Sequence, residues 1–262
     1  MNTALARLRD RPRPVEVTVD PTTYAVRLGP TVLDAFADWE VPTTGTVYGV
    51  ALNYRSALAA LGDAVNAAPY KSPPKAPILY IKPRNTWIAH GATVRLPADV
   101  PEVAIGATLG IVFGRVATRV SAQDALEFVA GYTVVNDLSV PHESYYRPAL
   151  RHQCRDGFCP IGPAIVPRSA IHNPDALGVR TFVNGELRLS ASLAELIRPI
   201  SVLIRDVTEF MTLDEGDVLL VGLPAGLPRA RAGDTLAVEI DQVGRLESAL
   251  IAEPAVIDGG LK

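Results

Sequence analysis

Cysteine is scarce in this chain, and its scarcity excludes several kinds of site. Cys154 and Cys159 are the only cysteines among the 262 residues. Two thiolates cannot complete a structural zinc site, and their spacing differs from the Cys-x-x-Cys pattern of zinc and redox motifs. A disulfide between them is not expected in a reducing compartment. We interpret both as thiols that are buried beside a turn.

Long hydrophobic runs and a large net charge are also missing. The formal net charge is −3 and the sequence pI is about 5.8, so nothing indicates nucleic acid or an anionic membrane as a partner. No apolar run approaches the ~18 residues that a membrane-spanning helix needs. Met1 to Arg13 is rich in arginine but lacks the apolar segment of a signal peptide. We therefore expect a cytoplasmic protein and interpret these arginines as a solvated end.

What the sequence does contain is a large hydrophobic fraction, arranged mainly as strands. Hydrophobic residues make up 48% of the chain, enough for a sizeable core. Apolar or alternating runs predict strands at residues 47–52, 78–81, 109–113, 132–135, 218–221 and 236–240. Asn184-Gly185 predicts a two-residue hairpin turn. Because strands dominate and no strand–helix–strand period repeats, we predict a β-rich α+β fold.

Helices and domain limits are predicted from composition. Helices are expected at residues 56–67, at 124–130 and from 193 to 210, the last disturbed by Pro199. Residues 1–45 are predicted to form a small N-terminal appendage, and residues 46–262 the main domain. In the appendage, the alternating run 15–19 and the run 24–28 predict a hairpin, and residues 33–39 a short helix. The proline-rich segment 69–77 predicts a loop.

One stretch combines two predicted strands with a carboxylate at a strand end. Gly106 and Thr108 lie at the start of the strand 109–113, at a spacing that places both on one face. The strand at 132–135 leads directly to Asp137. A hard cation such as Mg²⁺ is usually held by at least one or two carboxylates among several oxygen ligands, so Asp137 beside glycine and threonine is a poor metal site. The alternative interpretation of Asp137 is a strand-end aspartate that backbone amides satisfy.

Several segments, taken in their order and spacing, resemble the fumarylacetoacetate hydrolase superfamily from Gly45 to Glu253. These segments are residues 50–54, 131–137, 156–163, 183–186, 211–217, 233–234 and 243–246. The resemblance implies a mixed β-sandwich roll. It also implies that Gly106 and Thr108 stand where family members carry two metal-binding glutamates, while Asp137 is retained. Since glycine and threonine cannot replace two carboxylates, we expect no metal cofactor.

The same resemblance indicates that other functional positions are replaced. Ala57 and Ala60 stand where active members carry a histidine and a glutamate for proton transfer, and alanine cannot move a proton. Gln153 stands where a lysine is usual, and Leu223 where a threonine holds the substrate carboxylate. The usual metal and acid/base groups are therefore all missing, which leaves open whether the chain is an enzyme.

A narrower resemblance is to one branch of this superfamily, the first half of bifunctional decarboxylase/isomerases of 4-hydroxyphenylacetate (homoprotocatechuate) degradation. It rests on residues 69–75, 81–86, 145–148 and 154–162. It implies decarboxylation of 5-oxopent-3-ene-1,2,5-tricarboxylate and isomerisation of 2-hydroxyhepta-2,4-diene-1,7-dioate. Two alternatives are a non-catalytic scaffolding or regulatory paralogue of a metal-bearing partner subunit, and a divergent hydrolase or hydratase of 2-oxo acids. We expect a homodimer or a heteromer with such a partner.

Basic and aromatic residues are the remaining candidates for a site that binds a dicarboxylate or tricarboxylate 2-oxo acid. The candidate catalytic residues are Lys82, Asp137 and Arg151, since cations can bind carboxylates and stabilise the enolate that forms as CO₂ leaves. The candidate substrate-binding residues are Asn53, Tyr54, Tyr146 and Arg147.

The alternative for each cation is a solvated or ion-paired surface residue. Lys82 differs from the others because it directly follows an apolar strand. His142 follows Asp137 closely in the sequence and is a further candidate to line the same pocket. Glu102 lies upstream of Gly106, but its spacing differs from that of the missing glutamates.

Overall fold

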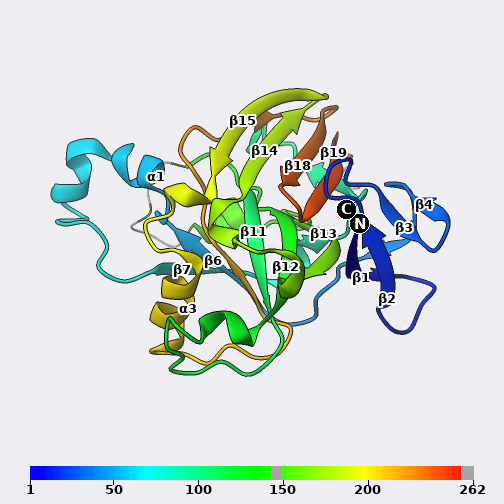
Figure 1. Ribbon diagram of the computed structural model, residues 1–262. Helices are drawn as coiled ribbons and strands as arrows, with labels where there is room; N and C mark the ends of the chain where they lie inside the picture. The colour runs from blue at the N-terminus through cyan, green and yellow to red at the C-terminus, as the bar shows by residue number, and fades with distance from the viewer. Residues whose placement is uncertain (143–144, 146–148, 255–262) are drawn as a thin grey trace, which may run out of the picture.

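Strands dominate the structure, as the sequence predicts, and most belong to two sheets (Figure 1). The computed structural model describes residues 1–142, 145 and 149–254. The strands of the larger sheet are β1 (Asn2–Leu8), β2 (Val15–Val19), β3 (Val26–Leu28), β4 (Thr31–Leu33), β5 (Trp39–Glu40), β6 (Val47–Ala51), β7 (Ile78–Lys82), β8 (Trp87–Ile88), β11 (Ala107–Phe113), β12 (Val129–Asn136), β13 (Cys159–Pro167) and β16 (Val218–Leu220). The strands of the smaller sheet are β9 (Thr93–Leu96), β14 (Gly178–Val183), β15 (Glu186–Ser192), β18 (Thr235–Ile240) and β19 (Gly244–Ala252). A separate pair is formed by β10 (Val103–Ala104) and β17 (Arg229–Ala230).

Helices are few and short. The α-helices of the described residues are α1 (Arg55–Ala59), α2 (Leu150–Gln153) and α3 (Ile200–Thr208). Single 3₁₀ turns are η1 (Gly62–Asn66), η2 (Arg84–Thr86), η3 (Ala125–Phe128), η4 (Arg168–Ala170), η5 (Pro174–Ala176) and η6 (Leu193–Glu195). Within the described ranges, no helix has the length and apolar character needed to cross a membrane.

The larger sheet has the strand order β4-β3-β2-β1-β13-β12-β11-β16-β6-β7, with β5 beside β1 and β8 beside β13. The smaller sheet has the order β15-β14-β18-β19-β9. Most neighbours are antiparallel, but β16–β6, β13–β8 and β19–β9 are parallel. Mixed sheets with few helices confirm the predicted β-rich α+β fold.

The centre of the larger sheet is buried on both faces. Every residue of β11 is buried, which explains why its sequence is a continuous apolar run rather than an alternating one. Leu109 and Ile111 point into the main core cluster, which includes Val238 and Leu246 of the smaller sheet. Val112 points the other way, into a second cluster with Val135. Figure 1 shows the smaller sheet above the strands β11 and β12.

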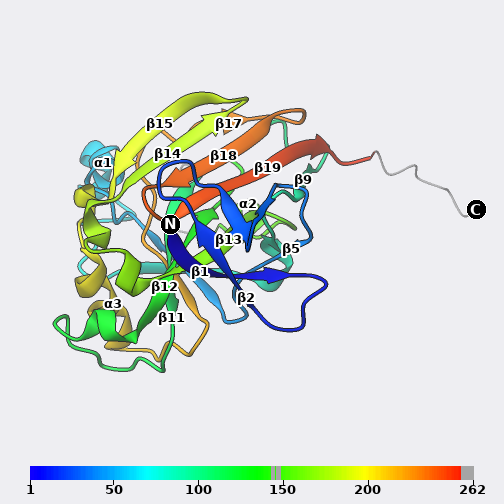
Figure 2. The same cartoon turned by 45° about the vertical axis from the view of Figure 1, so that its right-hand side comes forward.

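The N-terminal segment extends the larger sheet. Figure 2 shows its strands, in blue, lying beside β13, and residues of β1 pair with residues of β13. The predicted hairpin is confirmed, since β2 and β3 pair antiparallel. Arg9, Arg11 and Arg13 are exposed, as expected of a solvated end, whereas Ala4 and Ala6 of β1 are buried. The boundary near residue 45 stays a prediction.

The helix predicted at residues 33–39 is wrong. These residues instead contain the end of β4, a turn and the start of β5. The Asp34 side chain accepts a hydrogen bond from the Phe36 backbone N–H at 2.9 Å, a local bond that competes with helix formation. Trp39 is buried and pairs with Leu8 of β1, which holds the segment extended.

The other helices are shorter than predicted. The segment 56–67 divides into α1 and η1, with Gly62 at a φ of +51° that an α-helix cannot contain. The segment 124–130 gives only η3, because Val129 already belongs to β12. In the segment 193–210, Pro199 does not disturb a long helix but caps the start of α3. The Asn184-Gly185 turn between β14 and β15 is confirmed, with both residues at positive φ.

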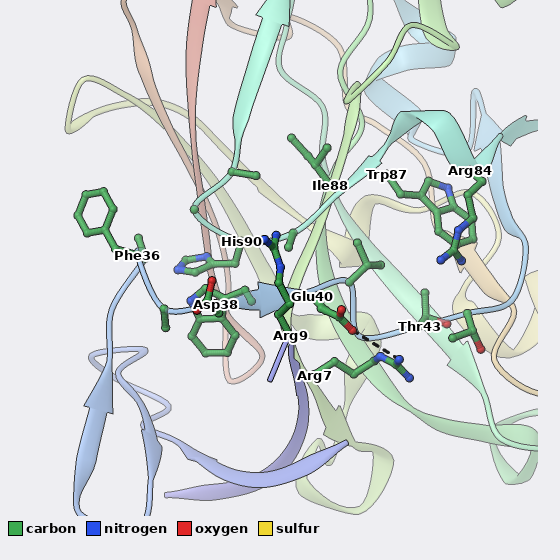
Figure 3. A pocket seen from close by; sticks show the side chains of 18 residues that line it. Arg7, Arg9, Phe36, Asp38, Glu40, Thr43, Arg84, Trp87, Ile88 and His90 are labelled. Atoms are coloured by element: carbon green, nitrogen blue, oxygen red, sulfur yellow. Dashed lines mark ion pairs between the residues drawn. The ribbon is translucent and has the colours of Figure 1, made fainter. Parts of the chain in front are cut away.

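A broad cavity of about 580 Å³ lies where residues 35–44 pass residues 84–92 (Figure 3). An ion pair of 3.5 Å joins Arg7 to Glu40, and the Arg84 guanidinium lies 5.2 Å from the centre of the Trp87 ring. His90 meets Trp39 edge to face, and its Nδ1 accepts a hydrogen bond from the Glu247 backbone N–H at 3.1 Å. Burial lowers the pKa of His90 to about 4.

The low pKa of His90 predicts a loss of stability in acid. Its ordinary pKa is 6.5, so as the pH falls from 6.5 to 4 the unfolded chain takes up a proton that the folded chain does not. The free energy of unfolding then falls by at most about 1.4 kcal/mol per pH unit from this residue. His90→Gln should remove this slope in urea unfolding measured across that range, whereas the exposed His172→Gln should keep it. Equal slopes in the two variants would contradict the assignment.

Candidate functional site

A narrower cavity, of about 280 Å³, lies at the ends of β6 and β7. Its wall comes from α1, from the segment after β12 and from the segment 223–229. The residues that line it are Val50, Ala51, Leu52, Ala57, Ala60, Tyr80, Ala104, Ser139, Pro141, His142, Tyr145, Gln153, Leu223, Pro224, Ala225, Gly226, Leu227 and Arg229. Apolar side chains supply most of this wall, and a few polar groups and one arginine converge on it, as is common in small-molecule sites.

Beneath this cavity lies a buried ion pair between Lys82 and Asp137. Nζ of Lys82 is 2.8 Å from Oδ1 of Asp137, and their side chains are 0% and 1% exposed. The ammonium also donates hydrogen bonds to the backbone carbonyls of Leu138 at 3.0 Å and Gln153 at 2.7 Å. The ammonium is therefore held by two carbonyl hydrogen bonds and one ion pair. This arrangement ties β7 to the end of β12 and to α2.

Tyr80 connects this ion pair to the cavity. Its hydroxyl donates a hydrogen bond to Oδ2 of Asp137, and its ring lines the cavity. Burial, and then the neighbouring Asp137 carboxylate, raise the pKa of Tyr80 well above its ordinary value. The phenol therefore stays protonated, and its oxygen retains lone pairs that can accept a proton from a ligand.

Gly49 makes room for the Tyr80 ring. It lies directly opposite Tyr80 across the β6–β7 pair, and a Cβ there would come within 2.1 Å of the ring. The position of Tyr80 is thus fixed by packing on one side and by Asp137 on the other.

The positions of the missing metal ligands are filled by other contacts. A Cβ at Gly106 would lie 3.0 Å from the Leu223 side chain and 2.3 Å from the Asp137 carbonyl oxygen. The Thr108 hydroxyl donates to the Gly222 carbonyl at 2.9 Å. Asp137, the carboxylate that remains, already contacts Lys82 and Tyr80. These residues do not fit a hard divalent cation, which needs several oxygen ligands and would meet an ammonium beside its one carboxylate.

Other residues singled out by the family resemblance lie on the cavity wall. Ala57, Ala60, Gln153 and Leu223 all line it, from segments far apart in the sequence. His142 lines it as well, and its Nδ1 lies 3.1 Å from the Val140 carbonyl oxygen. The His142 and His152 rings lie beside each other with centroids 5.3 Å apart.

Asn53 and Tyr54 lie beside the cavity rather than in it. The Asn53 amide donates to the Val221 carbonyl at 2.9 Å and accepts from the Arg198 backbone N–H at 3.0 Å. It therefore links the segments that contain Val221 and Arg198. Tyr54 is fully buried and precedes α1, and burial raises the pKa of its hydroxyl. Neither residue is placed where it would touch a molecule in the cavity.

Of the candidate catalytic residues, Lys82 and Asp137 lie together but Arg151 lies apart from them. The Arg151 side chain is 82% exposed and lies 3.5 Å from Asp99, because α2 directs it away from the cavity. Tyr146 and Arg147 lie outside the described residues. Glu102 does not approach Asp137 but pairs with Arg229 and Arg231.

The sequence interpretation missed Tyr80, Ser139 and Arg229. A signal for Tyr80 was present, since residues two apart in a strand share a face and Tyr80 is two residues before Lys82. No comparable pattern marks Ser139 or Arg229. Both are brought to the cavity by backbone pairing with Ala104, which is distant from each of them in the sequence.

Comparisons with known proteins agree with the fold. The family model described as "Fumarylacetoacetate (FAA) hydrolase C-terminal" matches residues 46–251. The "4-hydroxyphenylacetate degradation bifunctional isomerase/decarboxylase" of Escherichia coli is 41% identical over 212 residues, which are 81% of this chain and 48% of that protein. "Protein Rv2993c" of Mycobacterium tuberculosis is 32% identical over 203 residues, which are 77% of this chain and 74% of that protein. The chain thus spans about half the length of the bifunctional relatives that it matches.

Solved structures show the same fold. A 2-hydroxyhepta-2,4-diene-1,7-dioate isomerase from Mycobacterium marinum superposes with a TM-score of 0.77 at 25% identity, covering 97% of this chain and 99% of that one. A 5-carboxymethyl-2-hydroxymuconate delta-isomerase from Mycobacterium smegmatis superposes with a TM-score of 0.75 at 27% identity, covering 97% of this chain and 100% of that one.

The buried ion pair predicts a large effect of removing one partner. Lys82→Met leaves the Asp137 carboxylate buried without its cation, and we expect a loss of about 3–5 kcal/mol in the free energy of unfolding, measured in urea. The double variant Lys82→Met/Asp137→Asn should lose less, because no uncompensated charge remains. The exposed Arg151→Met should change stability by less than about 0.5 kcal/mol. A Lys82→Met variant as stable as the parent would contradict the ion pair.

Proposed function

Because the chain belongs to the fumarylacetoacetate hydrolase family, we propose that it is a subunit of a 4-hydroxyphenylacetate-degradation isomerase/decarboxylase and performs the isomerisation without a metal. The observation that carries this proposal is the chain of groups from the cavity inward, Tyr80 to Asp137 to Lys82. The names of the relatives support the substrate, a 2-hydroxy or 2-oxo diacid such as 2-hydroxyhepta-2,4-diene-1,7-dioate.

The isomerisation is a proton transfer. In 2-hydroxyhepta-2,4-diene-1,7-dioate the enol oxygen loses its proton, the double bonds shift, and C5 gains a proton to give the 2-oxo-3-ene tautomer. In our proposal the Tyr80 oxygen accepts the enol proton while its own proton passes to Asp137. Asp137 is neutral only until this proton leaves it again, and during that time the Lys82 ammonium remains hydrogen-bonded to the carbonyls of Leu138 and Gln153.

The proton added at C5 needs a second group. His142 lies on the described part of the cavity wall, and histidine is the side chain that most often acts as a general acid. Because Ala57 and Ala60 carry no acid or base, the relay of this chain differs from the histidine and glutamate pair that the family resemblance implies for other members.

Decarboxylation places different demands on a site. Loss of CO₂ leaves an electron pair that a nearby cation must stabilise. Lys82 is fully buried beneath the cavity and already holds two carbonyls and the Asp137 carboxylate, so it is poorly placed for this task. We therefore assign decarboxylation to a partner subunit that carries the intact carboxylates, with which this chain forms a heteromer.

The second candidate function is a non-catalytic paralogue that supports such a partner. The observation that favours it is that Ala57 and Ala60, which stand at the proton-transfer positions implied by the family resemblance, lie on the cavity wall. Under this alternative the Lys82–Asp137 pair has a structural role alone.

An isomerase assay separates the two candidates. The purified chain should convert 2-hydroxyhepta-2,4-diene-1,7-dioate, followed by its absorbance, at the same rate with and without EDTA. Conversion that appears only with a metal-bearing partner would favour the paralogue. Conversion by the chain alone that EDTA abolishes would contradict a metal-free site.

Substitution of the relay gives an independent test. Tyr80→Phe removes the hydroxyl and retains the ring that Gly49 accommodates, so we expect kcat to fall by about 100-fold or more with an unchanged fold. Tyr24→Phe is the matched control, because the Tyr24 hydroxyl binds Arg180 and does not line the cavity. An unchanged kcat in Tyr80→Phe would remove Tyr80 from the mechanism.

A further inference from the structure

Arg229 occupies a defined place on the wall of the narrow cavity. It begins β17 and lies opposite Ala104 of β10. On its other side Ala104 exchanges two backbone hydrogen bonds with Ser139, of 2.8 and 3.2 Å. These pairings place Arg229, Ala104 and Ser139 next to one another, and all three line the cavity.

Arg229 is the only permanently charged side chain among the described residues that line this cavity. The polar groups of Tyr80, Ser139, His142 and Gln153 can bind neutral parts of a ligand, but only a cation matches a carboxylate in a largely apolar wall. A guanidinium suits a carboxylate best, because two of its N–H groups can donate in parallel.

The contact that Arg229 makes within the chain is loose. Its Nη1 lies 3.5 Å from Oε1 of Glu102, and the two side chains are 47% and 33% exposed. Nη2 of Arg231 lies 3.9 Å from Oε2 of the same Glu102. Exposed pairs of this length contribute little free energy, so a ligand carboxylate can replace Glu102 at Arg229.

We propose that Arg229 binds the distal carboxylate of a dicarboxylate whose reactive end faces Tyr80, and that Glu102 competes with this carboxylate for the guanidinium. This inference rests on the proposed function, since it names the carboxylate subsite of the same cavity. It makes Arg229 a specificity-determining residue and Glu102 an internal competitor that weakens binding.

Binding of unreactive probes tests the proposal without turnover. Heptanedioate and heptanoate share a seven-carbon chain and differ by one carboxylate, and calorimetric titration of the full chain gives a dissociation constant for each. We expect heptanedioate to bind about tenfold or more tightly than heptanoate, and Arg229→Gln to abolish this preference. Arg229→Lys should keep part of it, because the charge remains but the paired donors do not.

Two further variants sharpen the result. Glu102→Gln should tighten heptanedioate binding by about two- to fivefold, since it removes the competitor and leaves Arg229 in place. Arg231→Gln is the matched control: it removes an equal charge two residues away, outside the cavity wall, and should leave the preference unchanged.

The inference would be overturned if Arg229→Gln kept the parent chain's preference for heptanedioate over heptanoate. It would also be overturned if Arg229→Gln and Arg231→Gln lost this preference equally, because that result would indicate general charge attraction. These outcomes are distinct from a failure of the proposed function. If the chain binds heptanedioate through Arg229 but does not convert the diene diacid, the carboxylate subsite is supported and the proposed isomerase activity is contradicted. If the chain is active but shows no preference that depends on Arg229, the activity is supported and the subsite is contradicted.

Discussion

The ion pair between Lys82 and Asp137 is the constraint on which the site depends. Two fully buried charges are tolerated only when each meets the other and their remaining hydrogen-bonding capacity is used. Here the ammonium meets one carboxylate and two carbonyls, and the carboxylate meets the Tyr80 hydroxyl. The pair joins β7, the end of β12 and α2, so the wall of the cavity and its chemistry are fixed by one contact.

Charge balance links this pair to the missing metal ligands. A divalent cation needs several anionic or carbonyl oxygens around it, whereas the single charge of Asp137 is balanced by a single ammonium. With glycine and threonine in place of two carboxylates, no negative charge is left for a cation to neutralise, and Leu223 and the Gly222 carbonyl occupy the adjoining space. The glycine at 106, the threonine at 108 and the Lys82–Asp137 ion pair are thus consistent with one another, since each fits a site without a divalent cation.

The sequence predicted what depends on local pattern and failed where the outcome depends on distant contacts. The strand at 109–113 was predictable because a continuous apolar run signals burial on both faces. The helix at 33–39 was not excluded by composition, since the pairing of Trp39 with Leu8, a distant contact, holds the end of that segment extended. Lys82 was identified from its place after an apolar strand, but Tyr80 resembles a core aromatic until its hydroxyl is seen to meet Asp137. The direction of Arg151 follows from α2 and Asp99, which no spacing in the sequence reveals.

In our proposal, different residues of the cavity wall provide recognition and chemistry. A neutral phenol backed by a buried ion pair lies at one part of the wall, and an exposed guanidinium at another. A ligand with a carboxylate at each end has one favourable orientation in such a site, because only the carboxylate far from the relay can meet the cation. Binding energy gained at Arg229 is then available to position the enol at Tyr80, and positioning of this kind accelerates proton transfer without any new catalytic group. Under our proposal, selectivity for diacids resides in residues of the cavity wall that are separate from Gly106 and Thr108, so it does not depend on a bound cation.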